Sequence, residues 1–359
     1  MHISDAGDGI EFFDGLLTPG FINAHCHIEL SYLKRKIAAG TGLVTFVQEV
    51  MKSSGVKDEV KQFAMQLAEQ ELYDSGTVAV GDICNTTDSI ELKQTNKLHW
   101  HNFIEVSGFV DAGAEPRLKN AKNILEDFTS RLQQPVSLSP HAPYSVSKTL
   151  FGELNEATVN QLISIHNGEC AAENELYFDK TGDFLQLYKN FGIDIAGFTP
   201  TGKTSMQSWL PYFNHHQSII SVHNSFTSQA DIDFYKLYKG SLAKFFFCIC
   251  ANANQYIEQK QPPIDLLRKN NCDIVIGTDS YASNWQLNLL EEMKVIQQIS
   301  IGQVGLEEIL KWATSNGAKA LQVEDKLGSF EKNKKPGIVL INQLDDLQLT
   351  PTSVAKRLL

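Results

Sequence analysis

The chain has 359 residues, of which 42% are hydrophobic and 20% are charged, an ordinary profile for a globular protein. Its formal charge of −11 argues against broad nucleic-acid binding. No segment approaches the roughly 20 apolar residues of a membrane helix, and the first residues, MHISDAGDGIEFF, do not read as a signal peptide. The six cysteines are scattered without a CxxC pair, which is typical of reduced thiols. We therefore expect a cytoplasmic protein with no nucleic-acid or membrane partner.

Short apolar runs alternate with helical patterns along most of the chain. Near-continuous apolar runs are typical of strands buried on both faces of a parallel sheet. Strands alternating with helices predict an α/β fold, and eight strands favour a (β/α)8 TIM barrel over a doubly wound open sheet. The expected strands are 16–25, 77–84, 101–109, 135–143, 161–169, 218–226, 243–251 and 272–280, and the expected helices are 42–74, 117–133, 229–239, 285–299 and 306–322.

The two ends of the chain read differently from its middle. After the last expected helix, a turn leads into a predicted strand at 338–342. We expect residues 1–17 and 331–359 to form a small, reduced β subdomain. The barrel domain would then span residues 18–330.

Several polar residues lie at the C-terminal ends of predicted strands, where barrel active sites are built. His25 and His27 are two residues apart, so in a strand both side chains point to one face. A lone His-x-His pair is more often chance or a buried core pair. His166 and Asp279 at other strand ends complete a set of nitrogen and oxygen ligands that suits Zn²⁺ or Fe²⁺ rather than Ca²⁺ or Mg²⁺. No lysine ends the fourth strand to bridge a second metal, so we expect one divalent ion.

Other polar residues are candidates for catalysis and substrate contact. Glu169 follows His166 by three residues and could aim its carboxylate over the metal, or could complement the dipole of a helix at 169–178. His223 could orient the reacting water, or be a buried structural histidine. His141 and Glu105 are candidate substrate contacts, with a plain structural role open for each.

A competing motif lies at residues 197–204. GFTPTGKT matches the G-x-x-x-x-G-K-[ST] phosphate loop and follows the strand-like IDIAG. Pro211 leaves little room for the helix that such a loop requires, and the strand-end residues would go unexplained. A P-loop nucleotide triphosphatase is therefore a distant alternative. A barrel that binds a ligand without catalysis is disfavoured because the ligand and acid set is complete.

The motifs PGFINAHCH, SPHAPYSVS, HNGE, SVHNS and GTDSYASNWQLNLLEEM resemble the cytosine deaminase-like branch of the amidohydrolase superfamily. That branch includes S-adenosylhomocysteine and adenosine-type deaminases, guanine deaminases and triazine chlorohydrolases. The similarity runs from about Leu17 to about Leu340. It implies metal ligands at His25, His27, His166 and Asp279, catalytic roles for Glu169, His223 and Asp279, and substrate near His141 and Asn284.

The resemblance also implies a reaction. It indicates hydrolytic deamination of an aminated N-heterocycle with release of ammonia, an adenine-type nucleoside being the first candidate substrate. Chloride displacement, or hydrolysis of another C–N bond on a related ring, is the alternative. A homodimer is common for such folds. One departure is Ala251, which stands where the branch typically has proline in a Cys-Pro-x-x-Asn-like turn, although Asn254 is retained.

Overall fold

The computed structural model describes residues 12–53, 55–300 and 302–359. Eight parallel strands form the centre of the protein, and each pairs with the next along the chain in two sets of four. They are β2 (Phe21–Cys26), β3 (Thr77–Cys84), β4 (His99–Val106), β5 (Val136–Pro140), β6 (Leu162–Asn167), β7 (Ser218–His223), β8 (Lys244–Ile249) and β9 (Asp273–Ile276).

Backbone hydrogen bonds join the two sets into a closed barrel. At one junction, the Thr278 amide donates to the His25 carbonyl at 3.0 Å. At the other, the His166 amide donates to the His141 carbonyl at 3.0 Å. The predicted α/β barrel is therefore confirmed, and both junctions lie next to predicted site residues.

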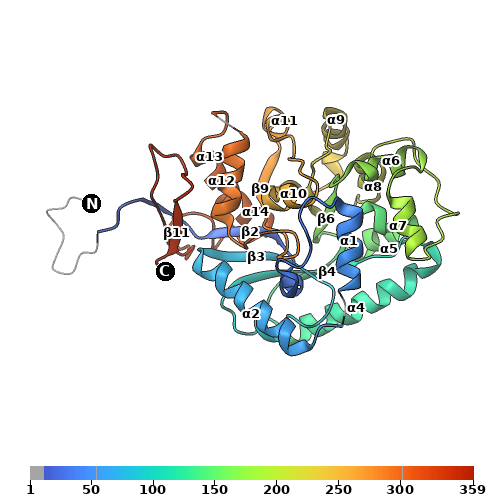
Figure 1. Ribbon diagram of the computed structural model, residues 1–359, viewed down its shortest axis with the longest axis horizontal. Coiled ribbons are helices and arrows are strands. Elements are labelled where there is room, and N and C mark those ends of the chain that lie inside the picture. The colour runs from blue at the N-terminus through green and yellow to red at the C-terminus, as the bar shows by residue number, and fades with distance from the viewer. Residues whose placement is uncertain (1–11, 54, 301) are drawn as a thin grey trace.

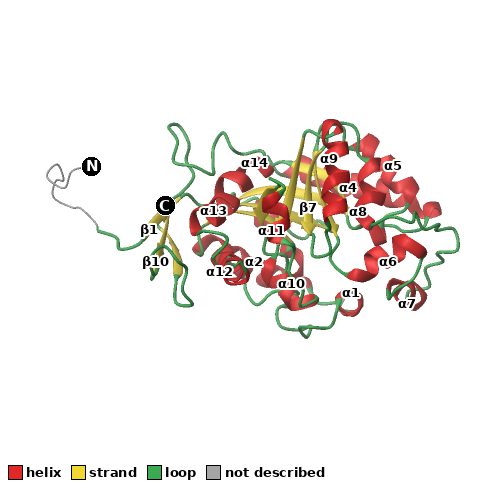
Figure 2. Ribbon diagram, turned by 90° about the horizontal axis from the view of Figure 1, so that it is seen from above, coloured by secondary structure: helices red, strands yellow, loops and turns green. Residues whose placement is uncertain are grey.

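Helices surround the barrel, as Figures 1 and 2 show. The segment predicted as one helix over 42–74 is instead two helices with a break that includes Gly55, whose φ of +94° favours glycine. The helices are α1 (Leu43–Lys52), α2 (Asp58–Asp74), α3 (Ile90–Lys93), α4 (Ala114–Arg131), α5 (Lys148–Ala157), α6 (Ala171–Asp179), α7 (Phe184–Asn190), α8 (Ser205–Trp209), α9 (Gln229–Tyr238), α10 (Ala251–Ile257), α11 (Ile264–Lys269), α12 (Leu289–Ile299), α13 (Leu306–Lys311) and α14 (Gly317–Ala320).

Alternate residues of one strand pack into different cores. In β8, Phe245 and Phe247 contact the layer between the strands and the outer helices, whereas Phe246 and Cys248 contact the barrel interior. Successive side chains of a strand point to opposite faces, so a strand that is buried on both faces needs an apolar residue at every position. This requirement explains why the strands read as continuous apolar runs.

A three-stranded antiparallel sheet lies beside the barrel and joins the two ends of the chain (Figure 2). Its order is β1 (Leu16–Thr18), β10 (Val339–Asn342) and β11 (Val354–Arg357). The strand predicted over 16–25 is divided at Pro19 and Gly20, so that one part joins this sheet and the other joins the barrel. Residues 1–11 of the predicted subdomain lie outside the described residues.

The structure also bears on the possible phosphate loop and on the expected lack of membrane helices. The possible phosphate loop at 197–204 has no strand before it, and the helix that follows is only the five residues of α8. Its Thr204 hydroxyl accepts the Gln207 amide at 3.2 Å as a helix cap, so the phosphate-loop architecture is absent here. None of the helices in the described part of the chain has the length and apolarity needed to cross a bilayer.

Candidate active site

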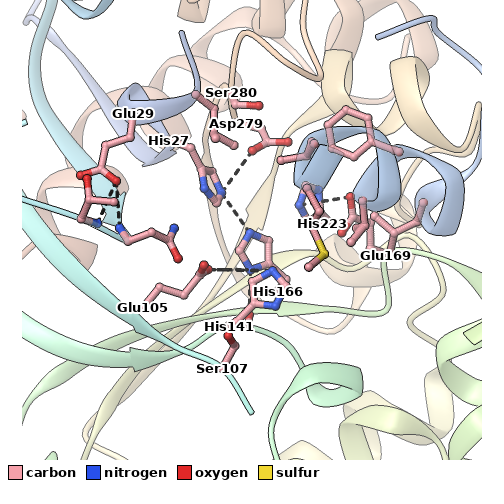
Figure 3. A pocket seen from close by; sticks show the side chains of 18 of the residues that line it. His27, Glu29, Glu105, Ser107, His141, His166, Glu169, His223, Asp279 and Ser280 are labelled. Carbon is pink, nitrogen blue, oxygen red and sulfur yellow. Dashed lines mark hydrogen bonds and ion pairs between the residues drawn. The ribbon is translucent and has the colours of Figure 1, made fainter. Parts of the chain in front are cut away.

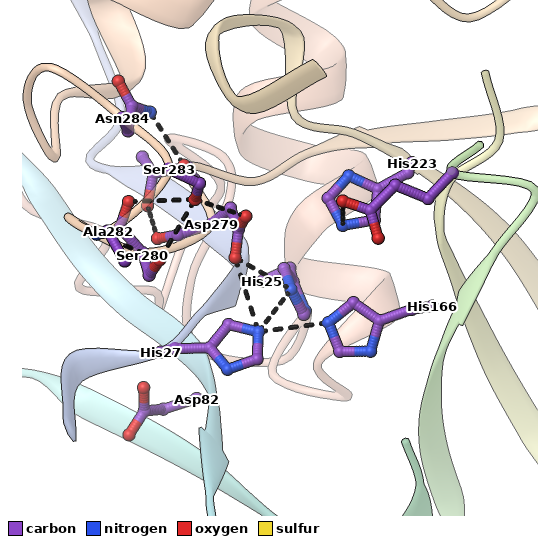
Figure 4. Close-up of polar contacts among 12 residues, drawn as sticks. His25, His27, Asp82, His166, His223, Asp279, Ser280, Ala282, Ser283 and Asn284 are labelled. Atoms are coloured by element: carbon purple, nitrogen blue, oxygen red, sulfur yellow. Dashed lines mark hydrogen bonds and ion pairs between the residues drawn. The ribbon is translucent and has the colours of Figure 1, made fainter. Parts of the chain in front are cut away.

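Four predicted metal ligands meet at the C-terminal end of the barrel (Figure 4). His25 is in β2, His27 directly follows this strand, His166 is in β6, and Asp279 comes shortly after β9. The His27 Nε2 atom lies 3.1 Å from both the His25 and the His166 Nε2 atoms. Asp279 Oδ1 lies 3.4 Å from His27 Nε2 and 3.6 Å from His25 Nε2. Strand order thus brings together residues up to 254 positions apart in the sequence.

The donor atoms of this cluster fit a divalent metal ion. The His166 Nδ1 atom donates to the His141 carbonyl at 2.7 Å, so the Nε2 atom of the neutral ring presents its lone pair to the cluster. His27 Nε2 faces His25 Nε2, His166 Nε2 and Asp279 Oδ1, and a single proton on it cannot form hydrogen bonds with all three atoms. A metal ion can bind all four. Donors around a tetrahedral zinc ion lie roughly 3.4 Å apart, given bonds of about 2.1 Å. The observed separations are close to this value.

Burial keeps the histidine rings of the cluster neutral. Desolvation lowers the pKa of His25, lowers that of His27 to about 3, and takes the pKa of His166 well below its usual value. Burial acts to raise the pKa of Asp279, but the neighbouring His25 and His27 rings bring it below its ordinary value. Neutral imidazoles and an ionised carboxylate are the forms that bind metal.

Two of the site residues have an uncommon backbone conformation. The φ angle is 71° at His223 and 57° at Asp279, in the left-handed region that residues other than glycine seldom adopt. Each residue lies where the chain leaves a barrel strand. The surrounding hydrogen bonds hold these conformations, and such strain is typical of functional sites.

Glu169 and His223 lie together on the opposite side of the cluster from His27 (Figure 3). His223 Nε2 is 3.6 Å from Glu169 Oε1, and both side chains are almost fully buried. Burial raises the pKa of Glu169 well above its usual value, and the charges of Asp279 and Glu258 add to this effect. The raised pKa favours the protonated carboxylic acid, which is the form that a general acid requires.

Asn254 orients the His223 ring and was not predicted to do so. Its Oδ1 atom lies 2.8 Å from His223 Nδ1. With the amide oxygen facing the ring, Nδ1 carries the hydrogen and Nε2 presents its lone pair towards Glu169. The sequence feature that points to Asn254 is the CANAN segment directly after β8, but the segment alone does not show which side chain Asn254 contacts.

Glu105 and His141 lie at the wall of the pocket, as expected for substrate contacts (Figure 3). Glu105 Oε1 is 4.0 Å from His141 Nε2 and 3.9 Å from His166 Nδ1. This oxygen is buried and accepts no hydrogen bond from the described residues. A buried carboxylate oxygen without a donor is available to a polar group of a ligand.

Asn284 does not line the pocket, in contrast to its predicted substrate contact. Its amide donates to the Thr278 carbonyl and to Glu292 Oε1, each at 2.8 Å. Glu292 also accepts the Asn252 amide at 2.9 Å. Asn284 therefore ties the loop that carries Asp279 to α12. We do not retain it as a substrate contact.

A cavity of about 370 Å³ opens from the cluster towards α1. Its inner end is polar and includes His27, His166, His223 and Asp279. Its outer end is largely apolar. The outer wall comprises Leu30, Tyr32, Leu43, Phe46, Val47, Val50 and Met51, with Lys61 and Asp88 nearby. The volume suits a small organic molecule.

Comparison with known proteins agrees with this architecture. The amidohydrolase family model matches residues 16–357, nearly the whole chain. The chain belongs to the amidohydrolase family. A 5'-deoxyadenosine deaminase of Methanococcus maripaludis is 27% identical over 353 residues, which are 93% of this chain and 77% of the relative. The predicted family is therefore confirmed.

Solved structures share the fold. Helicobacter pylori aminofutalosine deaminase in complex with methylthio-coformycin has a TM-score of 0.78 at 24% identity, over 95% of this chain and 82% of that one. Atrazine chlorohydrolase from Arthrobacter aurescens complexed with zinc has a TM-score of 0.72 at 13% identity, over 93% of this chain and 78% of that one. The predicted fold is confirmed by these likenesses as well as by the strand order.

Proposed function

We propose that this amidohydrolase deaminates an aminated N-heterocycle, with an adenine-type nucleoside as the first candidate, and that it uses one zinc ion (or Fe²⁺). The observation that carries the proposal is the position of Glu169, a buried carboxyl group with a raised pKa beside a cluster of His25, His27, His166 and Asp279. The deaminases among the relatives and the zinc in a structural neighbour support it.

The metal would be held by the three histidines and Asp279. A divalent ion at this position makes hydroxide available at neutral pH by lowering the pKa of water towards about 7. Asp279 has a second role, because its carboxylate can accept the proton that the water loses. Ser283 donates to Asp279 Oδ2 at 2.6 Å and so directs Oδ1 towards the histidines.

Glu169 would donate its proton to a ring nitrogen of the substrate. Protonation makes the adjacent carbon more electrophilic, so that hydroxide adds to it and a tetrahedral centre forms. The proton taken up by Asp279 then reaches the amino group, and the C–N bond breaks to release ammonia. One water is consumed and the carbon gains an oxygen. The ring nitrogen keeps the proton from Glu169, and Glu169 is reprotonated by the added hydroxyl group as the C=O bond forms.

His223 would stabilise the attacking water. Its Nε2 atom accepts a hydrogen bond because Asn254 holds the hydrogen on Nδ1. Burial lowers the pKa of His223, so the ring stays neutral at physiological pH. Glu105 and His141 would contact the polar edge of the substrate, and the apolar wall of α1 would contact its substituent.

The first experiment is ammonia release by zinc- or iron-loaded protein from a panel of aminated purines, pyrimidines, nucleosides and triazines. His25→Ala is the control, because it removes a ligand at the centre of the cluster. We expect release from one substrate group, absent in the control. Silence across the panel with metal bound, together with chloride release from a halogenated triazine, would replace deamination by chloride displacement at the same site.

A further inference from the structure

A buried ion pair lies beneath the metal cluster and takes no part in the proposed reaction. Asp82 is in β3, next to β2, and Lys93 is in α3; neither side chain has any exposed surface. The Lys93 Nζ atom is 2.5 Å from Asp82 Oδ2 and 3.2 Å from Cys84 Sγ. A fully buried lysine is uncommon, and its only carboxylate contact is this aspartate among the described residues.

This pair has no obvious value for stability alone. Removing two charges from water costs several kcal/mol for each ion, and a well-packed apolar pair is often as stable. Burial acts to lower the pKa of Lys93, but Asp82 raises it above its usual value, so the lysine stays charged. A role in positioning other groups would account for such a pair.

The other oxygen of Asp82 connects the pair to a metal ligand. Asp82 Oδ1 accepts the backbone amide of Ile28 at 2.8 Å, and Ile28 directly follows His27. There the chain leaves β2 and enters a 3-10 turn, Ile28–Leu33. Figure 4 shows the Asp82 carboxylate beside His27. The next residue is anchored too, because Glu29 Oε2 accepts two backbone amides, from Asn85 at 3.0 Å and from Thr86 at 3.1 Å.

We propose that Asp82 is a positioning residue for His27, and that Lys93 supplies the counter-charge that lets the Asp82 carboxylate stay buried. This inference rests on the metal-binding part of the proposed function and is independent of the substrate. The Nε2 atom of His27 lies 3.1 Å from the Nε2 atoms of both His25 and His166. A small rotation of the backbone at His27 would therefore change both of these distances. Partners that orient metal ligands commonly contribute about 10- to 100-fold in metal affinity.

Two charge-balanced double variants isolate the hydrogen bond to Ile28. Asp82→Asn with Lys93→Met keeps an acceptor oxygen at residue 82, whereas Asp82→Leu with Lys93→Met removes it. Neither variant leaves an unpaired buried charge. Thr158→Val, which loses a buried hydrogen bond to the Leu154 carbonyl, controls for loss of a buried polar contact elsewhere. Zinc affinity is measured by chelator competition, and the visible spectrum of the cobalt-loaded protein reports ligand geometry.

The proposal expects the Leu/Met variant to bind zinc about 10- to 100-fold more weakly and to show an altered cobalt spectrum. The Asn/Met variant and Thr158→Val should stay within a few-fold of the wild type. Equal affinity and equal spectra for the two double variants would overturn the positioning role. If the Leu/Met variant does not fold, Asp82→Val with Lys93→Met replaces it, because valine suits a strand. A wild-type protein that binds no zinc would instead overturn the metal site itself.

Discussion

The two ends of the pocket are built in different ways. At the inner end, His25, His166 and Asp279 come from strand ends or the residues just beyond, and closure of the barrel forces them together. At the outer end, the wall comes mainly from α1, with residues of the turn after β2 and of the loop after β3, and closure of the barrel does not force these side chains together. We therefore expect the inner end to determine which reaction is possible and the outer end to select among substrates.

Charge also differs between the two ends. Lys61 is the only lysine or arginine among the described residues that line the cavity, and it lies 3.1 Å from Asp88 and 3.6 Å from Asp58. Glu29 and Glu105 add further carboxyl groups to the lining of the cavity, Glu105 near its inner end. No lysine or arginine among the described lining residues is therefore free to bind an anionic group of a substrate. The outer end favours an uncharged substituent.

The largest effect on kcat should come from a substitution at the inner end of the pocket. We expect Asp279→Asn to lower kcat by at least about 10⁴-fold, because it weakens a metal ligand and removes the proton acceptor. Ammonia release and metal content, measured on the same sample, check this expectation. Turnover near the wild-type rate would show that Asp279 is neither an essential metal ligand nor the proton acceptor.

A second change separates the acid from the metal. Glu169→Gln should keep the bound metal and lower kcat by about 10²- to 10⁴-fold, because the amide cannot protonate the ring. Glu156→Gln is the matched control, since Glu156 is exposed on α5 and its one ion pair within the described part of the chain is with His215. Full activity of Glu169→Gln would show that another group supplies the proton.

The outer end should discriminate between substrates by charge. An uncharged nucleoside should be turned over with a kcat/KM at least about tenfold above that of its 5'-phosphate, because the wall repels the anion. Asp88→Asn leaves Lys61 less fully paired and should narrow this ratio. The comparison needs kcat/KM for both compounds with both proteins. If the ratio of the two kcat/KM values is the same in Asp88→Asn as in the wild type, Asp88 does not contribute to the discrimination against the 5'-phosphate.

The smallest effect concerns a buried acid behind the inner end. Glu173 Oε1 accepts the Gly168 amide at 2.7 Å, and burial raises the pKa of Glu173 to about 8. Because the folded pKa is above the unfolded value of 4.5, the folded state holds the proton more tightly, and stability falls as pH rises from about 4.5 to about 8. Glu173→Gln should reduce the loss of Tm between pH 5 and pH 8 by a few degrees. An unchanged difference would contradict the raised pKa.

Much of the inner end could be predicted from the sequence. The carboxyl ends of parallel strands meet at one end of a barrel, so locating the strands was enough to expect His25, His27, His166 and Asp279 to lie together. Asn284 points elsewhere for a physical reason, because a residue close to Asp279 in sequence can turn its side chain away from the pocket. Its amide satisfies Glu292 and a carbonyl rather than the pocket.

Sequence alone therefore determined the order of the eight barrel strands, the barrel class and the set of residues proposed to bind metal, because these depend on local periodicity and on the geometry of strand ends. Only the tertiary structure decided which residues support that set. Asn254 reaches His223 from α10, Asp82 reaches the residue after His27 from the neighbouring strand β3, and Lys93 reaches Asp82 from α3. These contacts depend on side-chain directions across elements that are distant in sequence, and no periodic pattern in one segment records them.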